Sequence, residues 1–220
     1  MKRATRVLAG AAATVFAVAA APAVAATTGT AAAAPQPTVG QSLERFSAQE
    51  ARDLESRYPV QAARLKQAVA LSAGDRGAAR AAGTTAVDPG AETGGYYKIR
   101  NLNSDKCLAI GNGKTANGAV AIQWDCLDIA DQVWWVGGNN IVNFNSGKYL
   151  AIGGGNTANG AKAIQWEHTG GNEQAWYGHT DGHILNWNSD KFLAIGASST
   201  ANGAKAVQWE YTGSNGQYWY

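Results

Sequence analysis

Three tryptophans in the C-terminal half of this 220-residue sequence are each followed directly by an acidic residue and could take part in ligand binding. They are Trp124-Asp125, Trp166-Glu167 and Trp209-Glu210. A sugar presents apolar C–H faces bordered by hydroxyls, and protein sites for sugars combine an aromatic platform with planar polar groups. The pairs therefore suit carbohydrate binding. The alternative is that these indoles belong to the hydrophobic core, and both interpretations stay open at the level of sequence.

Catalytic chemistry has less support from the residues. The three histidines, His168, His179 and His183, all lie in the second half of the chain. No nucleophile elbow, HExxH helix or Cys/His metal cluster accompanies them. A pair of carboxylates could cleave a glycosidic bond only at a defined separation across a cleft, which sequence does not reveal. We therefore expect neither an enzyme nor a metal or cofactor site.

The stretch that carries these tryptophans is written three times. Residues 101–124 read NLNSDKCLAIGNGKTANGAVAIQW, residues 143–166 read NFNSGKYLAIGGGNTANGAKAIQW, and residues 186–209 read NWNSDKFLAIGASSTANGAKAVQW. Leu108, Leu150 and Leu193 give a spacing of 42 and 43 residues. A fixed period of this kind indicates one supersecondary unit in three copies, each of which needs its neighbours to bury its apolar face.

Short alternating runs within each copy predict strands. In the first copy they lie at 97–101, 107–110, 121–124 and 133–136, separated by Asn-Ser-Asp and Thr-Ala-Asn-Gly sequences. Asn-Gly supplies the positive φ that a tight hairpin turn requires. A propeller blade also has four strands, but three blades do not close a propeller ring. We therefore expect an all-β fold that closes as a threefold barrel.

A Gln-x-Trp triplet ends each copy, at Gln132-Val133-Trp134, Gln174-Ala175-Trp176 and Gln217-Tyr218-Trp219. With the Leu-x-Ile strands and Asn-Gly-Ala turns, these triplets resemble the signature of ricin B-type lectin domains. The resemblance covers residues 96–220, with repeats of about 96–137, 138–179 and 180–220. It implies a β-trefoil of six hairpins and carbohydrate binding at up to three equivalent sites. For the indoles of the Gln-x-Trp triplets themselves we expect a place in the core.

Departures from the family's pattern bear on the site. Sugar-binding members place Asp directly after the Leu of the first conserved strand, where this chain has Ala109, Ala151 and Ala194. A methyl group cannot replace a carboxylate, and each lost charge-assisted hydrogen bond is worth about 1.5–3 kcal/mol. Galactose recognition of the ricin type is therefore not expected, and either the pocket has shifted or the fold serves another partner. The candidate carbohydrate-binding residues are Trp124, Trp166, Trp209, Asp131, Glu173, Gln132, Gln174 and Gln217.

Cys107 and Cys126 are the two cysteines of the chain and both lie in the first repeat. An even cysteine count in an exported protein indicates a disulfide, and the same pair within a repeat recurs in the family that the sequence resembles. Tyr149 and His168, and likewise Phe192 and Tyr211, stand at these positions in the other repeats. We expect aromatic packing there in place of the crosslink.

The N-terminal part has several segments. Residues 1–25 have the positive start, apolar Ala-rich run and small-residue cleavage pattern of a signal peptide, with a membrane anchor as the alternative. Residues 26–41 have the composition of a disordered leader, and 75–95 that of a linker. Residues 42–74 are expected to be helical, with a Ser47/Glu50 capping box, a break at Pro59 and an end at Gly74.

The helix over residues 47–73 carries one apolar stripe: Leu54, Tyr58, Ala62, Leu65 and Val69. Two interpretations stay open. The stripe packs on the neighbouring domain or acts as a spacer, or it lies in the groove of a partner protein.

Charge narrows the possible partners. The net charge of +2 falls to about −1 without the three basic residues of the signal peptide, and the repeat region holds slightly more acidic than basic residues. This argues against nucleic acid, which needs clustered Lys and Arg. We therefore predict a secreted, extracellular, non-catalytic lectin without a membrane span that binds glycans or cell-wall or plant polysaccharide. The alternative is a secreted protein-interaction adaptor or inhibitor whose sugar sites are degenerate.

Overall fold

The structure is a computed structural model that describes residues 43–81, 94–179 and 181–220. The expected signal peptide at 1–25, the leader at 26–41 and residues 82–93 of the expected linker lie outside the described residues.

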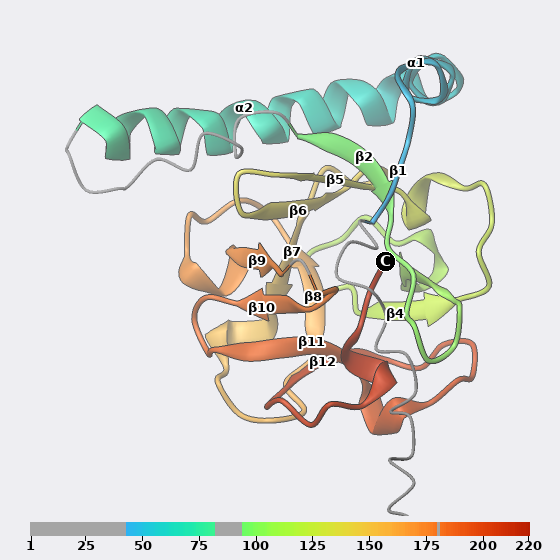
Figure 1. Ribbon diagram of the computed structural model, residues 1–220. Helices are drawn as coiled ribbons and strands as arrows, with labels where there is room; N and C mark the ends of the chain where they lie inside the picture. The colour runs from blue at the N-terminus through green and yellow to red at the C-terminus, as the bar shows by residue number, and fades with distance from the viewer. Residues whose placement is uncertain (1–42, 82–93, 180) are drawn as a thin grey trace, which may run out of the picture. The chain divides into compact units, whose positions relative to one another are not determined.

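Strands dominate the three repeats (Figure 1). A six-stranded sheet has the order β1-β2-β5-β6-β7-β8, a four-stranded sheet the order β12-β11-β10-β9, and β3 and β4 form a pair. The strands are β1 (Glu44–Arg45), β2 (Gly95–Lys98), β3 (Cys107–Ile110), β4 (Ala121–Trp124), β5 (Trp134–Gly137), β6 (Asn140–Asn143), β7 (Tyr149–Ile152), β8 (Ala163–Trp166), β9 (Trp176–Gly178), β10 (Ile184–Asn186), β11 (Lys191–Ile195) and β12 (Ala206–Trp209). Apart from β1, they follow the predicted pattern closely.

Hairpins β3–β4, β7–β8 and β11–β12 repeat one another in register, since Cys107, Tyr149 and Phe192 pair with Trp124, Trp166 and Trp209, respectively. Isolated bridges join these hairpins pairwise: Val120 to Ile164, Ile122 to Lys205 and Lys162 to Val207. A further bridge from Asn101 to Trp219 joins the first repeat to the last. This threefold closure is the β-trefoil that the sequence predicted.

The Gln-x-Trp indoles lie in the core, as predicted. Trp134, Trp176 and Trp219 are buried among the Leu and Ile side chains of the Leu-x-Ile strands. Each indole Nε1 donates to the backbone oxygen of Leu108, Leu150 or Leu193 at 2.9 Å. A buried indole N–H needs such a partner, so the spacing between the leucine and the triplet is a structural constraint.

Two helices precede the trefoil, α1 (Ala48–Arg57) and α2 (Pro59–Ala81). The capping box is confirmed, because the Glu50 amide donates to Ser47 Oγ at 3.3 Å and the Ser47 amide donates to Glu50 Oε2 at 2.7 Å. The break at Pro59 is confirmed too. The end predicted at Gly74 is wrong, because α2 continues to Ala81; a glycine inside a helix lowers its stability without terminating it.

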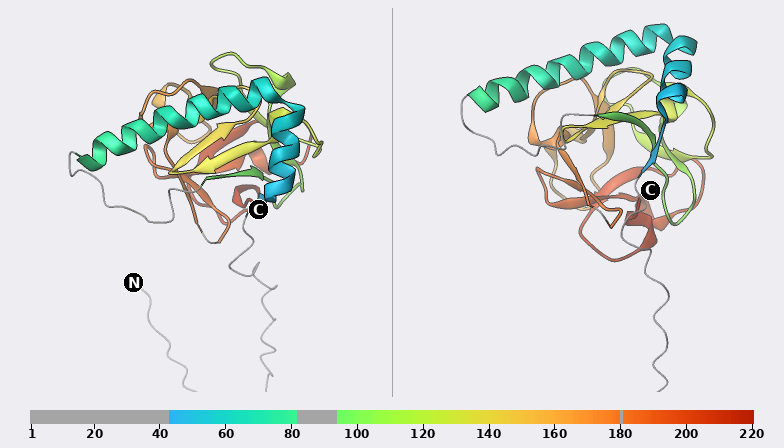
Figure 2. Two further views of the ribbon diagram at one scale, coloured as in Figure 1. Left: turned by 90° about the horizontal axis from the view of Figure 1, so that it is seen from above. Right: turned by 45° about the horizontal axis from the view of Figure 1, so that its top comes forward.

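The helices pack on the second repeat and on the adjoining part of the first, with α2 lying across β6 (Figures 1 and 2). Buried Leu54, Ala62, Leu65 and Ala68 meet Val142, Phe144 and Tyr149, with Tyr58 and Val69 at the margin. Tyr149 also donates its hydroxyl to the backbone oxygen of Ala68 at 2.6 Å. The apolar stripe therefore packs on the neighbouring domain, and the groove of a partner protein is not needed to cover it.

A polar cluster joins α1, α2 and β2. Glu55 on α1 forms an ion pair with Lys66 on α2 at 2.7 Å and accepts the hydroxyl of Tyr96 on β2 at 2.6 Å. These two hydrogen bonds hold the pKa of the Glu55 carboxyl below its ordinary value. Burial and the neighbouring carboxylate raise the pKa of Tyr96, so its hydroxyl stays a donor.

The disulfide between Cys107 and Cys126 is confirmed. At the same positions of the second repeat, the Tyr149 and His168 rings lie 4.6 Å apart, and in the third Phe192 and Tyr211 lie 5.6 Å apart. Aromatic contacts thus take the place of the crosslink, as predicted.

Candidate functional site

The three tryptophans of the Trp-acid pairs are half exposed. Trp124, Trp166 and Trp209 retain 41%, 39% and 40% of their accessible surface. They are therefore outside the core, and each lies at the outer end of its hairpin, at the last residue of β4, β8 or β12.

Each of these indoles rests on the Asn-Gly turn of another repeat. A Cβ on Gly118 would lie 3.6 Å from Trp166 Cζ3, one on Gly160 3.4 Å from Trp209, and one on Gly203 3.8 Å from Trp124. These glycines have φ near +80°, as the Asn-Gly pattern predicted. The neighbouring turn therefore supports one edge of the ring and leaves the rest open to solvent.

The asparagines of these turns have a second role that sequence reasoning missed. Asn117, Asn159 and Asn202 each accept a hydrogen bond at 3.0 Å from the backbone amide that follows an exposed tryptophan in another repeat. Because Asn-Gly is a strong turn signal, the predicted turn was a sufficient explanation for both residues. Nothing in their spacing shows which repeats lie next to each other.

The buried Gln123, Gln165 and Gln208, each directly before an exposed tryptophan, were missed as well. Their side-chain amides donate to backbone oxygens in the turn of another repeat, and Ser104, Ser146 or Ser189 donates to their Oε1 at 2.7 Å. The recurring Asn-x-Asn-Ser and Gln-Trp sequences were the signal for this pairing.

The glutamines of the Gln-x-Trp triplets are a correction to the predicted site. Gln132, Gln174 and Gln217 are buried. In the second repeat Gln174 Nε2 donates to the Glu167 backbone oxygen at 2.7 Å, and its Oε1 accepts from the Thr169 amide at 2.9 Å. The other two glutamines make the same two bonds. Since these amides are already satisfied inside the protein, they hold the loop after the exposed tryptophan and do not face a ligand.

A hollow of about 350 Å³ lies beside Trp166 in the second repeat. Ala151, Ile152 and Ile164 line it together with Gly154 and Gly155, and Trp166, Thr169 and Glu173 complete the wall. Thr169 donates its hydroxyl to Glu173 Oε1 at 2.9 Å, which holds the carboxylate in place. An indole, a hydroxyl and a carboxylate thus meet around an apolar floor, which suits a small polar ligand with one apolar face.

The other two repeats lack parts of this arrangement. In the first, Asp131 replaces Glu173 and Leu127 replaces Thr169, and burial raises the pKa of the Asp131 carboxyl. In the third, Gly216 stands at the acidic position. A Cβ there would come within 2.9 Å of Ser198 Oγ, so the space of the acid is already filled.

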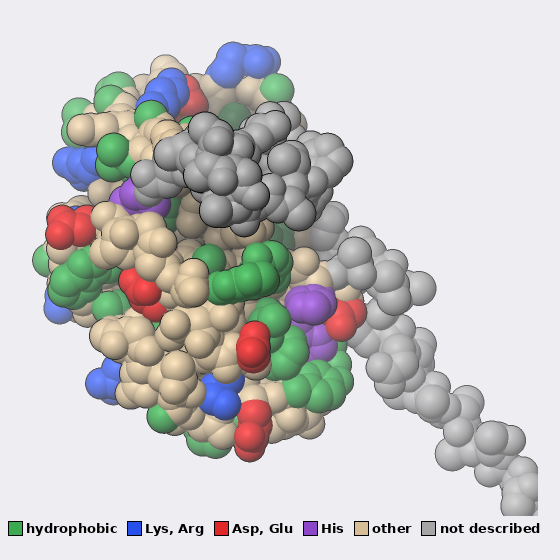
Figure 3. Space-filling model, turned by 90° about the vertical axis from the view of Figure 1, so that its left-hand side faces the viewer, with side chains coloured by type: hydrophobic (Ala, Val, Ile, Leu, Met, Phe, Trp, Pro, Cys, Tyr) green, Lys and Arg blue, Asp and Glu red, His purple; other side chains and the backbone are tan. Residues whose placement is uncertain are grey.

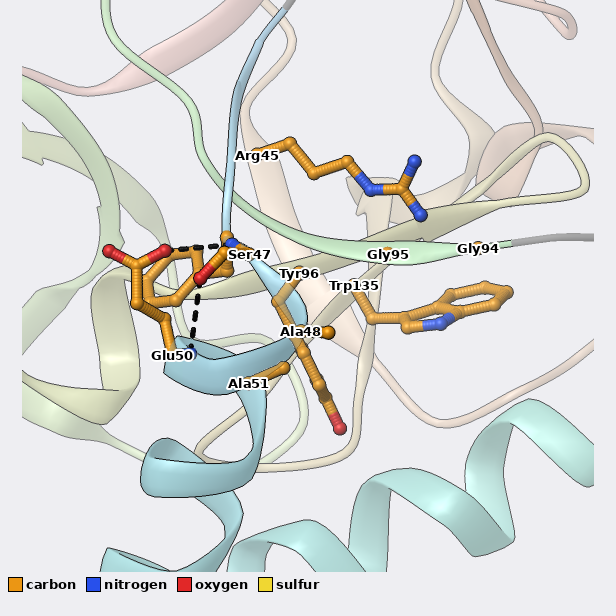
Figure 4. Close-up of a pocket in the computed structure, with 10 residues that line it drawn as sticks. Arg45, Ser47, Ala48, Glu50, Ala51, Gly94, Gly95, Tyr96 and Trp135 are labelled. Carbon is orange, nitrogen blue, oxygen red and sulfur yellow. Dashed lines mark hydrogen bonds between the residues drawn. The ribbon is translucent and has the colours of Figure 1, made fainter.

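A second hollow, of about 590 Å³, lies between the start of α1 and strands β2 and β5. Figure 4 shows the Ser47–Glu50 capping box in its wall, with Arg45 and Trp135 further along. Gly94 and Gly95 also line it, and they directly follow residues that lie outside the described part of the chain.

The described residues hold neither a metal-binding cluster nor a membrane-spanning helix. No group of three or more His, Cys, Asp or Glu side chains there could hold a metal ion. No helix in the same part of the chain is both long and apolar enough to cross a membrane.

The sequence matches the model of the "Ricin-type beta-trefoil lectin domain-like" family over residues 85–166 and 136–209. Together these matches span more than half of the chain. The chain belongs to this family. The ricin-type assignment agrees with the three Gln-x-Trp cores and with the hairpin pairing described above.

The structure of this chain is similar to those of natural and designed proteins. ThreeFoil, a designed threefold-symmetric protein, is 32% identical with a TM-score of 0.53, and the match covers 56% of this chain and 95% of that one. An exo-β-1,3-galactanase from Clostridium thermocellum is 31% identical with a TM-score of 0.52, over 56% of this chain and 29% of that one. This chain therefore matches less than a third of the galactanase. No curated protein matches the sequence.

Proposed function

We propose that this chain is a secreted, non-catalytic carbohydrate-binding module that recognises glycans or cell-wall polysaccharide through its trefoil. The observation that carries the proposal is the second-repeat hollow, where Trp166 and Glu173 meet over an apolar floor. The indole provides a face for the C–H groups of a sugar ring, and the carboxylate provides acceptors for its hydroxyls.

The three sites of the proposal are unequal. The second repeat combines tryptophan, threonine and glutamate. The first has tryptophan with an aspartate of raised pKa, and the third has tryptophan and Thr212 but no acid. Because each charge-assisted hydrogen bond contributes about 1.5–3 kcal/mol, the expected affinity falls in that order. Weak binding at more than one site of the same polymer would add avidity.

The test is a glycan screen of the full chain, including β-1,3-galactan because of the galactanase match, with Trp166→Ala and Glu173→Gln as variants. We expect retention of at least one polysaccharide by the wild type and a loss of at least about tenfold in affinity for either variant. Retention that neither substitution changes would contradict the proposed site. Absence of retention on every glycan would favour the protein-interaction alternative.

That alternative now depends on the trefoil loops. The stripe from Leu54 to Val69 is covered by the second repeat and is not open to a partner. If the chain is an adaptor or inhibitor, its partner surface is not this stripe.

A further inference from the structure

A partly exposed pair of aromatic rings lies where the second repeat meets the third. Trp187 directly follows β10 and retains 51% of its accessible surface. Tyr177, on the neighbouring strand β9, stacks against it with ring centroids 4.5 Å apart and an interplanar angle of 34°. Figure 3 views the side on which β9 and β10 lie in Figure 1, and hydrophobic side chains are exposed there beside acidic ones.

Hydrogen bonds tie the segment that carries Trp187 to the wall of the second-repeat hollow. Asn188 Nδ2 donates to the backbone oxygen of Gly155, which lines the hollow, at 3.0 Å. Asn186 Nδ2 donates to the backbone oxygen of Glu173, also at 3.0 Å. The Trp187 amide donates to the Ala175 oxygen at 2.9 Å. The residues on both sides of Trp187 therefore contact the residues that form the candidate site.

The same junction occurs in the other repeats, but without an open aromatic ring. Beside the first-repeat site, Asn145 donates to the Gly113 oxygen at 3.0 Å, and the residue before it, Phe144, is fully buried under the helices. Beside the third-repeat site, Asn103 donates to the Ser198 oxygen at 2.8 Å, and the residue before it is Leu102. An open tryptophan thus accompanies the one site that has both threonine and glutamate.

We infer that the second-repeat site continues onto the Trp187–Tyr177 surface and binds a saccharide chain of at least two residues in preference to a single sugar. The inference rests on the proposed function. One sugar residue occupies the hollow at Trp166 and Glu173, and the next one along the chain stacks on the exposed indole. A flat, open aromatic surface suits a continuing polymer because it limits the ligand on one face only.

The experiment measures how affinity depends on chain length. Isothermal titration of the full chain uses one- to six-residue oligomers of β-1,3-galactan, cellulose, chitin and xylan, with wild type, Trp187→Ala, Trp166→Ala and Leu102→Ala. Leu102→Ala is the matched control because it removes an apolar side chain at the same position of the first repeat. Thermal unfolding of each variant shows whether a lost affinity reflects a lost fold. Sedimentation shows whether the substitution changes self-association.

For any series that the wild type binds, we expect affinity to rise by roughly three- to tenfold from one to a few residues. Trp187→Ala should remove this rise and leave monosaccharide affinity unchanged, Leu102→Ala should keep it, and Trp166→Ala should weaken every length. A length dependence that survives in folded Trp187→Ala protein overturns the inference while the proposed function stands. If Trp187→Ala instead abolishes self-association, the surface is a contact between copies and the inference is overturned as well. If neither these series nor the glycan screen yields a ligand for the wild type, the proposed function itself fails.

Discussion

The second and third repeats present the same backbone position in opposite environments. Phe144 in the second repeat is fully buried, with the rings of Tyr58 and Tyr96 packed edge-on at 6.2 and 5.6 Å. Trp187 in the third repeat is half exposed and contacts Tyr177 on its own sheet. A threefold fold therefore does not imply threefold surfaces, because the N-terminal helices cover one copy and leave the other open.

Two more residues of the second repeat differ from their counterparts in the other repeats, and both lie where the helices cover this repeat. Gly147 replaces an aspartate of the other repeats, and a Cβ there would lie 3.0 Å from the backbone oxygen of Arg64 on α2. Tyr149 replaces a cysteine or phenylalanine and donates to α2 through its hydroxyl. The repeat has thus diverged where the helix meets it, which makes the helices an integral part of the folded unit.

The largest expected effect comes from truncating the two equivalent aromatic residues. Phe144→Ala should lower the free energy of unfolding by about 3–5 kcal/mol, because it leaves a cavity under the helices. Trp187→Ala should lower it by less than about 1 kcal/mol, because half of that side chain already contacts water. Urea unfolding measures both, and equal losses would contradict the difference between the two environments.

The next effect contrasts the crosslinked repeat with its aromatic counterpart. Replacing Cys107 and Cys126 together by alanine should cost about 3 kcal/mol, mainly through a less constrained unfolded chain. His168→Ala removes the ring contact with Tyr149 and should cost about 1 kcal/mol. Thermal unfolding of both variants without reductant gives the comparison, and a larger loss for His168→Ala would show that the aromatic pair is the stronger tie.

Gly147→Asp tests whether the helix requires the glycine. Aspartate tolerates the left-handed backbone, since Asp105 and Asp190 hold φ of 56° and 52° at this position. The added side chain must displace α2, so we expect a loss of about 1–3 kcal/mol and faster proteolysis of the helices. Gly154→Asp is the control, because Gly154 has a similar φ of 62° and nothing within 4 Å of its Cβ position. Equal losses in both variants would show that backbone strain, and not the helix, is responsible.

The smallest effect concerns pH. Because the pKa of Glu55 is lowered from 4.5 in the folded protein, its stabilising effect is complete above pH 4.5 and is lost as the pH falls through its folded pKa. Glu55→Gln should therefore reduce stability by about 1 kcal/mol or less near neutral pH and approach the wild type in acid. Unfolding curves measured between pH 7 and pH 3 test this, and a constant difference would contradict it.

Much of the fold was predictable because its signals are local. Strand alternation, the Asn-Gly turns, the Ser47/Glu50 cap and the break at Pro59 each depend on residues close in sequence. The end of α2 was missed because Gly74 weakens a helix without stopping it. The apolar stripe of the helix showed which of its faces is covered. Which part of the trefoil covers it depends on long-range packing, and the periodicity of the sequence does not encode that.

The candidate site was predictable only in part for the same reason. Tryptophan and the acids could be named from their repeated spacing, but the burial of Gln132, Gln174 and Gln217 depends on how each loop folds back on itself. Trp187 could not be singled out from the sequence, because Asn-Trp-Asn is an ordinary loop sequence. Its importance follows from its exposure, since no helix of the described residues covers it as α2 covers Phe144.

The most direct test of the central claim compares the three tryptophans that face solvent in equivalent positions. Trp124→Ala, Trp166→Ala and Trp209→Ala are titrated separately with whichever polysaccharide the wild type retains. The claim that the second repeat is the principal carbohydrate site predicts the largest loss for Trp166→Ala, a smaller one for Trp124→Ala and the smallest for Trp209→Ala. Equal losses, or a larger loss for Trp209→Ala, would contradict it.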